Sequence, residues 1–398
     1  MSEWFAQQLQ ELRARALDRH LREVASGQGA IVELKGKRLI NFSSNDYLGL
    51  ANDPKLRDAA GAAIAQFGVG AGASRLISGT QSPHVELEAA LAKWKGTPTA
   101  LSFSSGYAAA LGTIPALVRK GDVVLLDKLC HASLIDGAKL SGATLRVFPH
   151  NHLGKLESHL KWAQREHPDQ RVLILTESVF SMDGDRAPLS QLVELKKRFG
   201  ARLLLDEAHA VGVIGPNGRG LAAAENLSGN VDVQMGTMSK ALGVSGGYIC
   251  GSRSLIEWLI NRARSFIYST APPPAVAAAA RAAVDFLASP EGEKRRVALW
   301  DRIKLMQKIL PADSATANQS SKVARHADSA IFPWLVGDEE SAVDLAADLQ
   351  REGFFVPAIR YPTVGKGSAR LRITVTAAHT EEQITSLGET IRRLRGGE

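Results

Sequence analysis

The chain has 398 residues, of which 45% are hydrophobic and 22% charged, as is usual for a globular protein. This length favours two domains, or one large domain with a smaller partner. The longest weakly polar tract, residues 272–287, carries Arg281 and Asp285, which excludes a membrane-spanning run of roughly 20 apolar residues.

The formal net charge is +7, and the basic residues are scattered rather than gathered in one stripe or arm. Without such a stripe or a recognisable module, we expect no binding to nucleic acid. The first eight residues lack the basic and apolar regions of a signal peptide, which favours a cytoplasmic protein. Cys130 and Cys250 lie in apolar sequence and predict neither a disulfide framework nor a metal site.

The N-terminal segment, residues 1–45, is predicted to form a helix followed by a hairpin. Apolar residues at helical spacing predict an amphipathic helix over residues 3–25. Residues 31–42 predict two strands that turn at Gly36. A large domain, residues 46–288, is expected to follow.

A glycine-dense stretch, residues 68–80, resembles a phosphate loop only superficially. It lacks the Gly-Lys-Ser/Thr ending and does not lie between a strand and a helix, so a flexible substrate or interface loop is the better interpretation. Ser82 and Pro83 then predict a capped helix start.

Seven apolar runs of strand length alternate with helical segments between residues 99 and 251. The runs are 100–103, 123–126, 145–148, 172–176, 203–205, 231–235 and 248–250. Such alternation predicts an α/β fold with a mostly parallel seven-stranded sheet covered on both faces. Residues 289–398 predict a smaller α+β C-terminal domain.

Ligands of parallel sheets bind at the carboxyl ends of the strands, where this sequence places several reactive side chains. Gly106 and Tyr107 open a helix directly after a strand, and such a helix start can hold a phosphate. His131 follows the next strand, and a lone histidine there is either structural or a stacking or acid–base group. For the helix start at Gly106 and Tyr107, a simple capped helix without a ligand is an equally good interpretation.

Two later strand ends carry acids. Ser181 lies in a polar turn with Asp183 and Asp185, but an acidic pair without nearby histidines makes a poor metal site. Asp206 emerges directly from an apolar strand, which is costly unless a cation pairs with it. The letters Asp-Glu-Ala-His at 206–209 also occur in ATP-dependent helicases, which need a P-loop that this chain lacks.

Lys240 lies among small and hydroxylated residues and has no charged neighbour between Val233 and Gly251. Partial desolvation favours the neutral, nucleophilic amine of a lysine, although a solvated lysine at a strand end fits this stretch equally well. A nucleophilic amine, a buried carboxylate, a stacking histidine and a phosphate site are together what pyridoxal phosphate requires. The lysine forms a Schiff base, and the carboxylate keeps the pyridine nitrogen protonated.

The chain resembles the α-oxoamine synthases, which are pyridoxal-phosphate enzymes of the type I aminotransferase fold, over nearly its whole length. The resemblance rests on motifs at residues 45–49, 70–80, 180–185, 206–209, 237–243 and 362–364. Ala210 and Val211 depart from the family, in which a Gly-Thr pair is common, and we expect an effect on packing alone.

The resemblance implies a role for each residue of the predicted site. It implies catalytic roles for Lys240, His131 and Asp206. It implies cofactor-binding roles for Gly106, Tyr107, His131, Ser181, Asp206, His209, Thr237, Ser239 and Lys240. Arg372 and Asn45 would bind the carboxylate of the amino acid, and an arginine fork suits that task. Arg22 and Thr363 would contact the acyl substrate, and His131 would also face the substrate.

The family condenses an amino acid with an acyl thioester and releases carbon dioxide. Residues 41–50, 267–270 and 358–364 are most similar to the member that uses L-alanine and a pimeloyl thioester of CoA or acyl carrier protein, and the resemblance implies a homodimer. A 5-aminolevulinate synthase or a glycine C-acetyltransferase would share every cofactor residue. A non-catalytic regulator would need a DNA-binding module, and residues 1–40 are too short for one. An NAD-dependent dehydrogenase is excluded because the sequence lacks Gly-x-Gly-x-x-Gly after the first strand.

Overall fold

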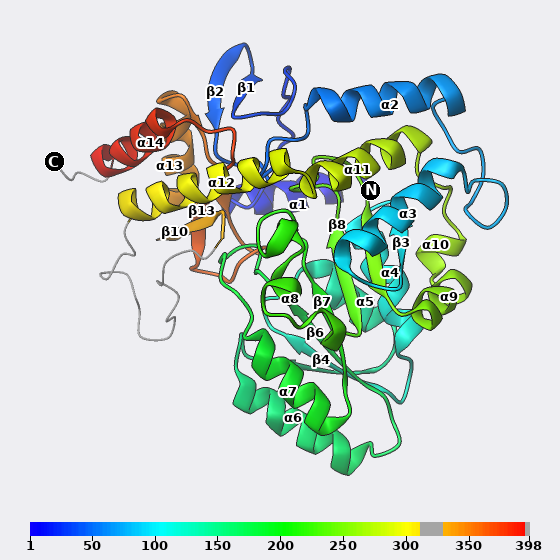
Figure 1. Ribbon diagram of the computed structural model, residues 1–398. Helices are drawn as coiled ribbons and strands as arrows, with labels where there is room; N and C mark the ends of the chain where they lie inside the picture. The colour runs from blue at the N-terminus through cyan, green and yellow to red at the C-terminus, as the bar shows by residue number, and fades with distance from the viewer. Residues whose placement is uncertain (311–328, 395–398) are drawn as a thin grey trace. The chain divides into compact units, whose positions relative to one another are not determined.

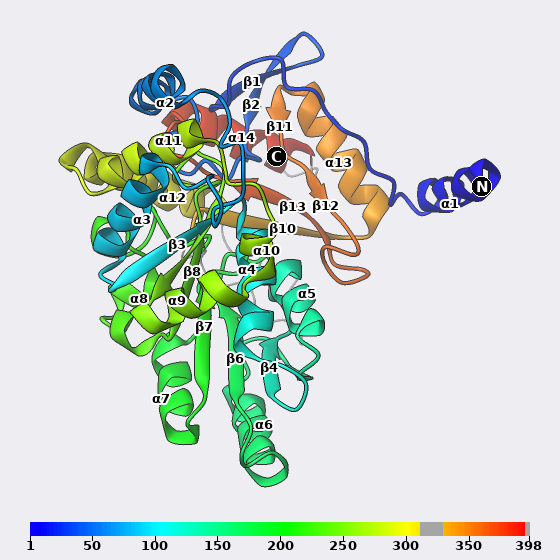
Figure 2. The ribbon, with the colours of Figure 1, turned by 90° about the vertical axis from the view of Figure 1, so that its right-hand side faces the viewer.

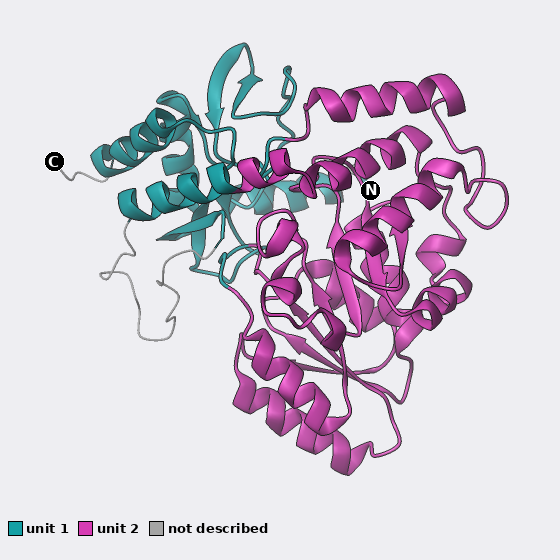
Figure 3. Ribbon diagram, viewed as in Figure 1, with its two compact units in different colours: residues 1–49, 182–185, 297–398 teal, residues 50–181, 186–296 magenta. Residues whose placement is uncertain are grey.

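The computed structural model of the chain describes residues 1–310 and 329–394. Two compact units emerge (Figure 3): the larger comprises residues 50–181 and 186–296, and the smaller comprises residues 1–49, 182–185 and 297–398. No helix within the described ranges combines the length and apolar character needed to cross a membrane.

The larger unit is built on a seven-stranded sheet (Figure 1). In spatial order its strands are β3 (Thr99–Phe103), β9 (Gly247–Gly251), β8 (Val233–Thr237), β7 (Arg202–Asp206), β6 (Val172–Glu177), β4 (Val123–Asp127) and β5 (Thr144–Phe148). β9 is antiparallel to both of its neighbours, and the other pairs are parallel. The predicted α/β fold with a mostly parallel seven-stranded sheet is therefore confirmed.

Helices connect and cover these strands. They are α2 (Pro54–Phe67), α3 (Ser82–Lys95), α4 (Gly106–Leu117), α5 (Ala132–Leu140), α6 (Leu153–Glu166), α7 (Leu189–Phe199), α8 (Leu221–Ala224), α9 (Arg253–Arg262), α10 (Arg264–Ile267) and α11 (Pro274–Leu287). Every residue of β4, β8 and β9 is buried, which requires cover on both faces of the sheet. Figure 2 shows β4, β6 and β7 running side by side through this layer.

The smaller unit joins the two ends of the chain. It holds α1 (Ser2–Ala14), β1 (Ile31–Leu34), β2 (Lys37–Asn41), β10 (Ile331–Gly337), α13 (Glu339–Arg351), β11 (Phe354–Phe355), β12 (Ala358–Ile359), β13 (Ala369–Thr374) and α14 (Glu381–Leu394), and α12 (Pro290–Ile309) leads into it. β2 pairs with β11, so the segment 1–45 that the sequence suggested as separate shares a sheet with C-terminal residues.

The predicted helix over residues 3–25 is wrong in its second half, because α1 ends at Ala14. Ala16 has a φ of 50°, which a helix cannot contain. The carbonyl groups of Ala16 and Asp18 accept hydrogen bonds from the Arg360 guanidinium, and Val24 bridges Leu34 as an extended residue. Contacts within the smaller unit thus replace the helix that the local pattern favours. The hairpin turn at Gly36 is confirmed, with Lys35 and Gly36 both at positive φ.

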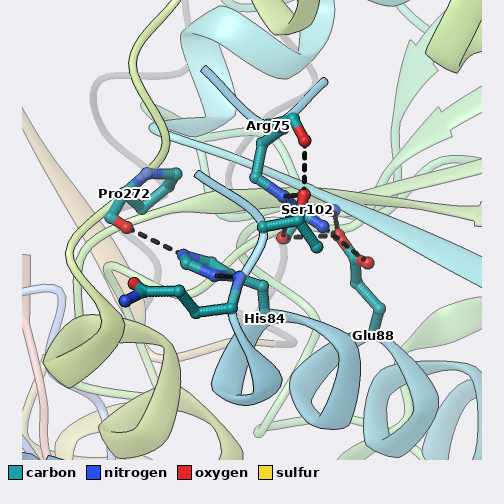
Figure 4. Close-up of polar contacts among 7 residues, drawn as sticks. Arg75, His84, Glu88, Ser102 and Pro272 are labelled. Atoms are coloured by element: carbon teal, nitrogen blue, oxygen red, sulfur yellow. Dashed lines mark hydrogen bonds and ion pairs between the residues drawn. The ribbon is translucent and has the colours of Figure 1, made fainter. Parts of the chain in front are cut away.

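The glycine-dense stretch 68–80 is tied to the rest of the larger unit by a partly buried ion pair (Figure 4). The Arg75 guanidinium donates to both carboxylate oxygens of Glu88, at 2.9 and 3.0 Å, and to the Ser102 hydroxyl. The N-cap of α3 lies one residue earlier than predicted, at Gln81 instead of Ser82, and the Gln81 backbone amide donates to His84 Nδ1 at 3.1 Å. His84 Nε2 hydrogen-bonds to the carbonyl oxygen of Pro272, which joins the start of α3 to a segment that is distant in sequence.

Arg75→Met is expected to lower the free energy of unfolding by about 2 kcal/mol, because it leaves the partly buried Glu88 carboxylate without its guanidinium partner. Chemical denaturation measures this change. Arg165→Met is the matched control, since Arg165 is 71% exposed and forms an ion pair with its neighbour Glu166, and it should change stability by less than about 0.5 kcal/mol. Equal stability of the two variants would contradict the prediction.

Candidate active site

Four neighbouring strands of the larger unit end at one edge of the sheet and bring the predicted cofactor residues there. β8, β7, β6 and β4 lie next to one another in that order. Lys240 follows β8, Asp206 ends β7, Glu177 ends β6, and His131 follows β4. These residues are far apart in sequence, and the parallel sheet brings their strand ends together.

Lys240 lies in a tight loop between β8 and β9. The Gly243 amide donates to the Lys240 carbonyl at 2.8 Å, and Val244 and Met238 close the loop with a second main-chain bond of 2.8 Å. Gly243 has a φ of 69°, and a side chain there would lie 2.5 Å from the Ala51 backbone nitrogen. Only glycine fits this turn, which fixes where the half-buried Lys240 emerges.

Asp206 is the buried carboxylate of the group. It is 5% exposed, and its Oδ1 accepts a hydrogen bond from the Ala208 amide at 2.9 Å. Burial raises the pKa of Asp206, while the charge of Lys240 opposes the rise. The carboxyl group therefore needs a cationic partner to stay ionised.

His209 lies three residues beyond Asp206 and contacts the lysine directly. Its Nε2 is 2.7 Å from Lys240 Nζ, and its side chain is buried. Ala210 and Val211, which depart from the family pattern, are completely buried, and both of their amides donate to the Glu207 carbonyl. The expectation that they alter packing alone stays a prediction.

Glu177 is a second buried carboxyl group, directly beside Asp206 in the β6–β7 register. Its Oε1 accepts the His131 amide at 2.5 Å, and the Ser181 amide also donates to this side chain. Burial, followed by the charge of Asp206, raises the pKa of Glu177 to about 8. Burial and the neighbouring Asp206 carboxylate therefore favour the protonated form of Glu177.

His131 caps α5 and keeps part of its surface open to solvent. Its Nδ1 lies 2.8 Å from the Ser133 hydroxyl and accepts the Ser133 amide at 3.2 Å. Partial desolvation by the surrounding protein lowers the pKa of His131, which Asp206 opposes. A neutral imidazole with an accessible surface suits stacking on a flat ring.

The predicted phosphate site combines a helix start with two hydroxyl groups. Ser105 caps α4, so Gly106 and Tyr107 occupy its first turn, where amides lack partners within the helix. Thr237 and Ser239 hydroxyl oxygens are 2.8 Å apart, and Gly106 lies against Thr237. The Tyr107 hydroxyl donates to Asp136 at 2.5 Å, so the main chain of Tyr107 is the part suited to a phosphate.

In the smaller unit, Asn45 and Arg372 meet through a residue that was not singled out, Tyr47. Arg372 is 5% exposed; it donates to the Thr374 hydroxyl at 3.0 Å and hydrogen-bonds to Tyr47. The Tyr47 hydroxyl reaches Asn45 Oδ1 at 3.4 Å. Burial raises the pKa of Tyr47, and Arg372 opposes the rise. One network therefore links both residues predicted to bind a carboxylate.

The other two predicted substrate residues of the smaller unit are not brought into direct contact. Arg22 lines a cavity of about 720 Å³ together with Arg360, Leu34, Val356 and Pro357. Thr363 accepts a hydrogen bond from Arg19, at 3.4 Å, rather than from Arg22. The lining also includes the acidic Asp18 and Glu23, so the cavity presents both signs of charge beside its apolar side chains.

The larger unit fits pyridoxal phosphate on the chemistry of its own side chains. Within the described ranges, the hydrogen bond from Ala208 is the one recorded for the Asp206 carboxylate, which leaves Oδ2 available for a pyridinium N–H. Lys240 supplies the amine, His131 a ring surface and α4 the amides for a phosphate.

The sequence did not identify Glu177 and Tyr47 as site residues, and only Glu177 had a local signal. Glu177 is an acid at the end of an apolar strand, which is the same signal that identified Asp206. Tyr47 carries no such signal, because its contact with Arg372 joins positions 325 residues apart.

The comparisons with known proteins agree with this chemistry. The family described as aminotransferase class I and II matches residues 37–391. The chain is 47% identical to the 8-amino-7-oxononanoate synthase of Geobacter sulfurreducens, over 96% of both chains. It is 43% identical to the protein of that name from Thermoanaerobacter pseudethanolicus, over 96% of this chain and 94% of the relative.

Two solved structures share the fold. Serine palmitoyltransferase from S. paucimobilis, with bound PLP, has a TM-score of 0.90 and 31% identity, and the match covers 98% of this chain and 97% of that chain. The 8-amino-7-oxononanoate synthase of Francisella tularensis has a TM-score of 0.75 and 29% identity, with 90% and 98% covered.

Glu177→Gln should flatten the pH dependence of stability between about pH 5 and pH 8. The pKa of Glu177 is raised in the folded chain, so its contribution is full below the unfolded value of 4.5 and is lost as the pH rises through about 8. Urea unfolding at several pH values measures the difference from wild type. Glu166→Gln, at an exposed glutamate, is the control. Parallel curves for wild type and Glu177→Gln would show that Glu177 is already ionised.

Proposed function

We propose a decarboxylating condensation of L-alanine with a pimeloyl thioester as the reaction of this chain, which belongs to the class I and II aminotransferase family and, within it, to the family of the 8-amino-7-oxononanoate synthases. The observation that carries the proposal is the 2.7 Å contact of the Lys240 amine with His209, beside the buried carboxylate of Asp206. The products are 8-amino-7-oxononanoate, carbon dioxide and the free thiol, and the reaction belongs to biotin biosynthesis.

Pyridoxal phosphate, when bound, supplies an aldehyde for amines and a ring that accepts electrons from the α-carbon of the amino acid. Lys240 would hold the cofactor through its amine, and its Nζ would be the base for the α-proton of the amino acid. Asp206 holds a proton on the pyridine nitrogen, which offsets the cost of burying its own charge. His131 would lie against the ring, and His209 and Ser181 would hold its phenolic oxygen.

The phosphate is held by main-chain amides and hydroxyl groups. Gly106 and Tyr107 donate from the first turn of α4, whose positive end favours an anion. Thr237 and Ser239 add hydroxyl groups. The contact between Thr237 and Ser239, at 2.8 Å, supports their acting together.

Arg372 and Asn45 bind the alanine carboxylate. The network through Tyr47 supports this assignment, because it holds the buried guanidinium in one orientation. A fixed carboxylate would set the orientation of the α-carbon, and thereby which of its bonds breaks.

Arg22 and Thr363 contact the pimeloyl thioester. The cavity beside Arg22 supports an acyl chain that ends in a carboxylate, since apolar walls suit the methylene groups and a guanidinium suits the charge. Condensation joins the α-carbon to the thioester carbonyl, releases the thiol, and loses the alanine carboxylate as carbon dioxide.

The protein acts as a cytoplasmic homodimer in this proposal. Exposed apolar side chains support self-association: Val69 is 79% exposed, Ile77 80% and Tyr268 73%, and a backbone bridge between Ser74 and Thr270 holds their two loops together.

The purified protein should release free thiol from pimeloyl-CoA or pimeloyl-acyl carrier protein only when L-alanine is present, with one carbon dioxide for each thiol. Glycine with succinyl-CoA or acetyl-CoA tests the 5-aminolevulinate synthase and glycine C-acetyltransferase alternatives. Serine with palmitoyl-CoA tests the activity named for the structural neighbours. Faster turnover of any of these pairs than of alanine with the pimeloyl thioesters would overturn the assignment.

Lys240→Ala should abolish covalent labelling by pyridoxal phosphate and borohydride, because this amine is the one that bonds to the cofactor. Mass spectrometry of the reduced protein measures one added cofactor per chain in wild type. Lys161→Ala, at a lysine that is 65% exposed, should label normally. Labelling that survives in Lys240→Ala would place the cofactor on another lysine.

A further inference from the structure

Lys95 and Glu207 form an ion pair in the interior of the larger unit that the proposed reaction does not use. The exposed fractions of their side chains are 1% and 0%. Lys95 Nζ donates both to Glu207 Oε2 and to the Arg219 carbonyl. Glu207 Oε1 accepts the Ala222 amide at 3.0 Å, so both charged groups have further partners.

Glu207 lies between the two residues that would face the cofactor ring. Its amide donates to the Met235 carbonyl of β8 at 2.9 Å, and its carbonyl accepts the Ala210 and Val211 amides, each at 2.9 Å. This turn encloses His209, whose Nε2 contacts Lys240. The position of the Glu207 main chain therefore sets the turn that carries His209 directly after Asp206.

The segment after His209 has little regular structure of its own and is held from α3. The Trp94 indole donates to the Asn217 carbonyl at 2.9 Å, next to the contact of Lys95 with Arg219. Gly220 has a φ of 105°, and a side chain there would lie 2.5 Å from Glu207 Oε1. The loop closes tightly around the Glu207 carboxylate.

Stability alone gives little reason for two buried charges. Desolvation costs several kcal/mol per ion, and well-packed apolar side chains of similar volume are often as stable or more stable. A buried pair does, however, allow one arrangement of its surroundings, because every other arrangement leaves a charge unpaired. A site that must hold Asp206 and His209 in fixed positions benefits from that selectivity.

We propose that Lys95 and Glu207 are positioning residues that fix the turn carrying Asp206 and His209 against the cofactor. This inference rests on the proposed function, since it concerns the same site. The charge of Glu207 also raises the pKa of Asp206, so the pair is close enough to influence that carboxyl group.

The test compares wild type, Lys95→Met and the double variant Lys95→Met/Glu207→Gln as holoenzymes. Two readouts are used: the dissociation constant of pyridoxal phosphate, and the midpoint of the pH titration of the bound cofactor's absorbance. Thermal stability is measured in parallel. Lys161→Met, which breaks an exposed pair with Glu157, is the control.

Lys95→Met should raise the dissociation constant by about tenfold or more, as loss of an outer-shell contact does at other sites, and should shift the titration midpoint. The double variant removes both charges, so it should regain stability but keep the weakened binding and the shifted midpoint. If Lys95→Met does not fold, the double variant decides alone.

The inference is overturned if the double variant, or a folded Lys95→Met, has a dissociation constant within twofold of wild type and an unshifted titration midpoint. The pair would then be a purely stabilising contact. If wild type itself neither binds pyridoxal phosphate nor is labelled by it, the proposed function fails instead. The two failures are therefore distinguishable.

Discussion

The burial of charge at the carboxyl edge of the seven-stranded sheet is the constraint on which the site depends. Asp206 and Glu177 end adjacent strands and are both almost inaccessible to water. Two neighbouring carboxylates cannot both be ionised there without compensation. One is kept neutral by burial, and the other lies close to the cation of Lys240. The arrangement leaves one carboxylate beside the Lys240 amine and the His131 imidazole, which is the combination that the proposed cofactor needs.

Main-chain contacts around these groups explain how so few side chains hold the site. The Glu177 carboxyl group accepts amides that belong to the His131 and Ser181 turns, so one side chain ties two strand ends together. The Glu207 carboxylate likewise accepts the Ala222 amide, and so ties α8 to the end of β7. These buried carboxyl groups hold backbone amides in place by hydrogen bonds in addition to carrying charge. That second role is a physical reason why the fold tolerates the cost of their desolvation.

In the smaller unit, arginine side chains hold the surrounding chain segments in a similar way. Arg360 donates to the carbonyl groups of residues 16 and 18, and thereby holds the N-terminal chain in a non-helical conformation. Arg372 is held by Thr374 and Tyr47. Guanidinium groups suit this role because their fork of donors can satisfy several oxygens from different segments at once.

The sequence by itself determined the alternation of strands and helices, the hairpin at Gly36 and the reactive side chains at the strand ends, because these features follow from local periodicity, turn chemistry and the cost of a charge beside an apolar run. Tertiary structure alone decided the end of α1 at Ala14 and the partners of Glu177, Tyr47 and Lys95. Those outcomes depend on contacts between positions far apart in the chain, and a local pattern holds no information about which distant group will satisfy a buried donor or charge.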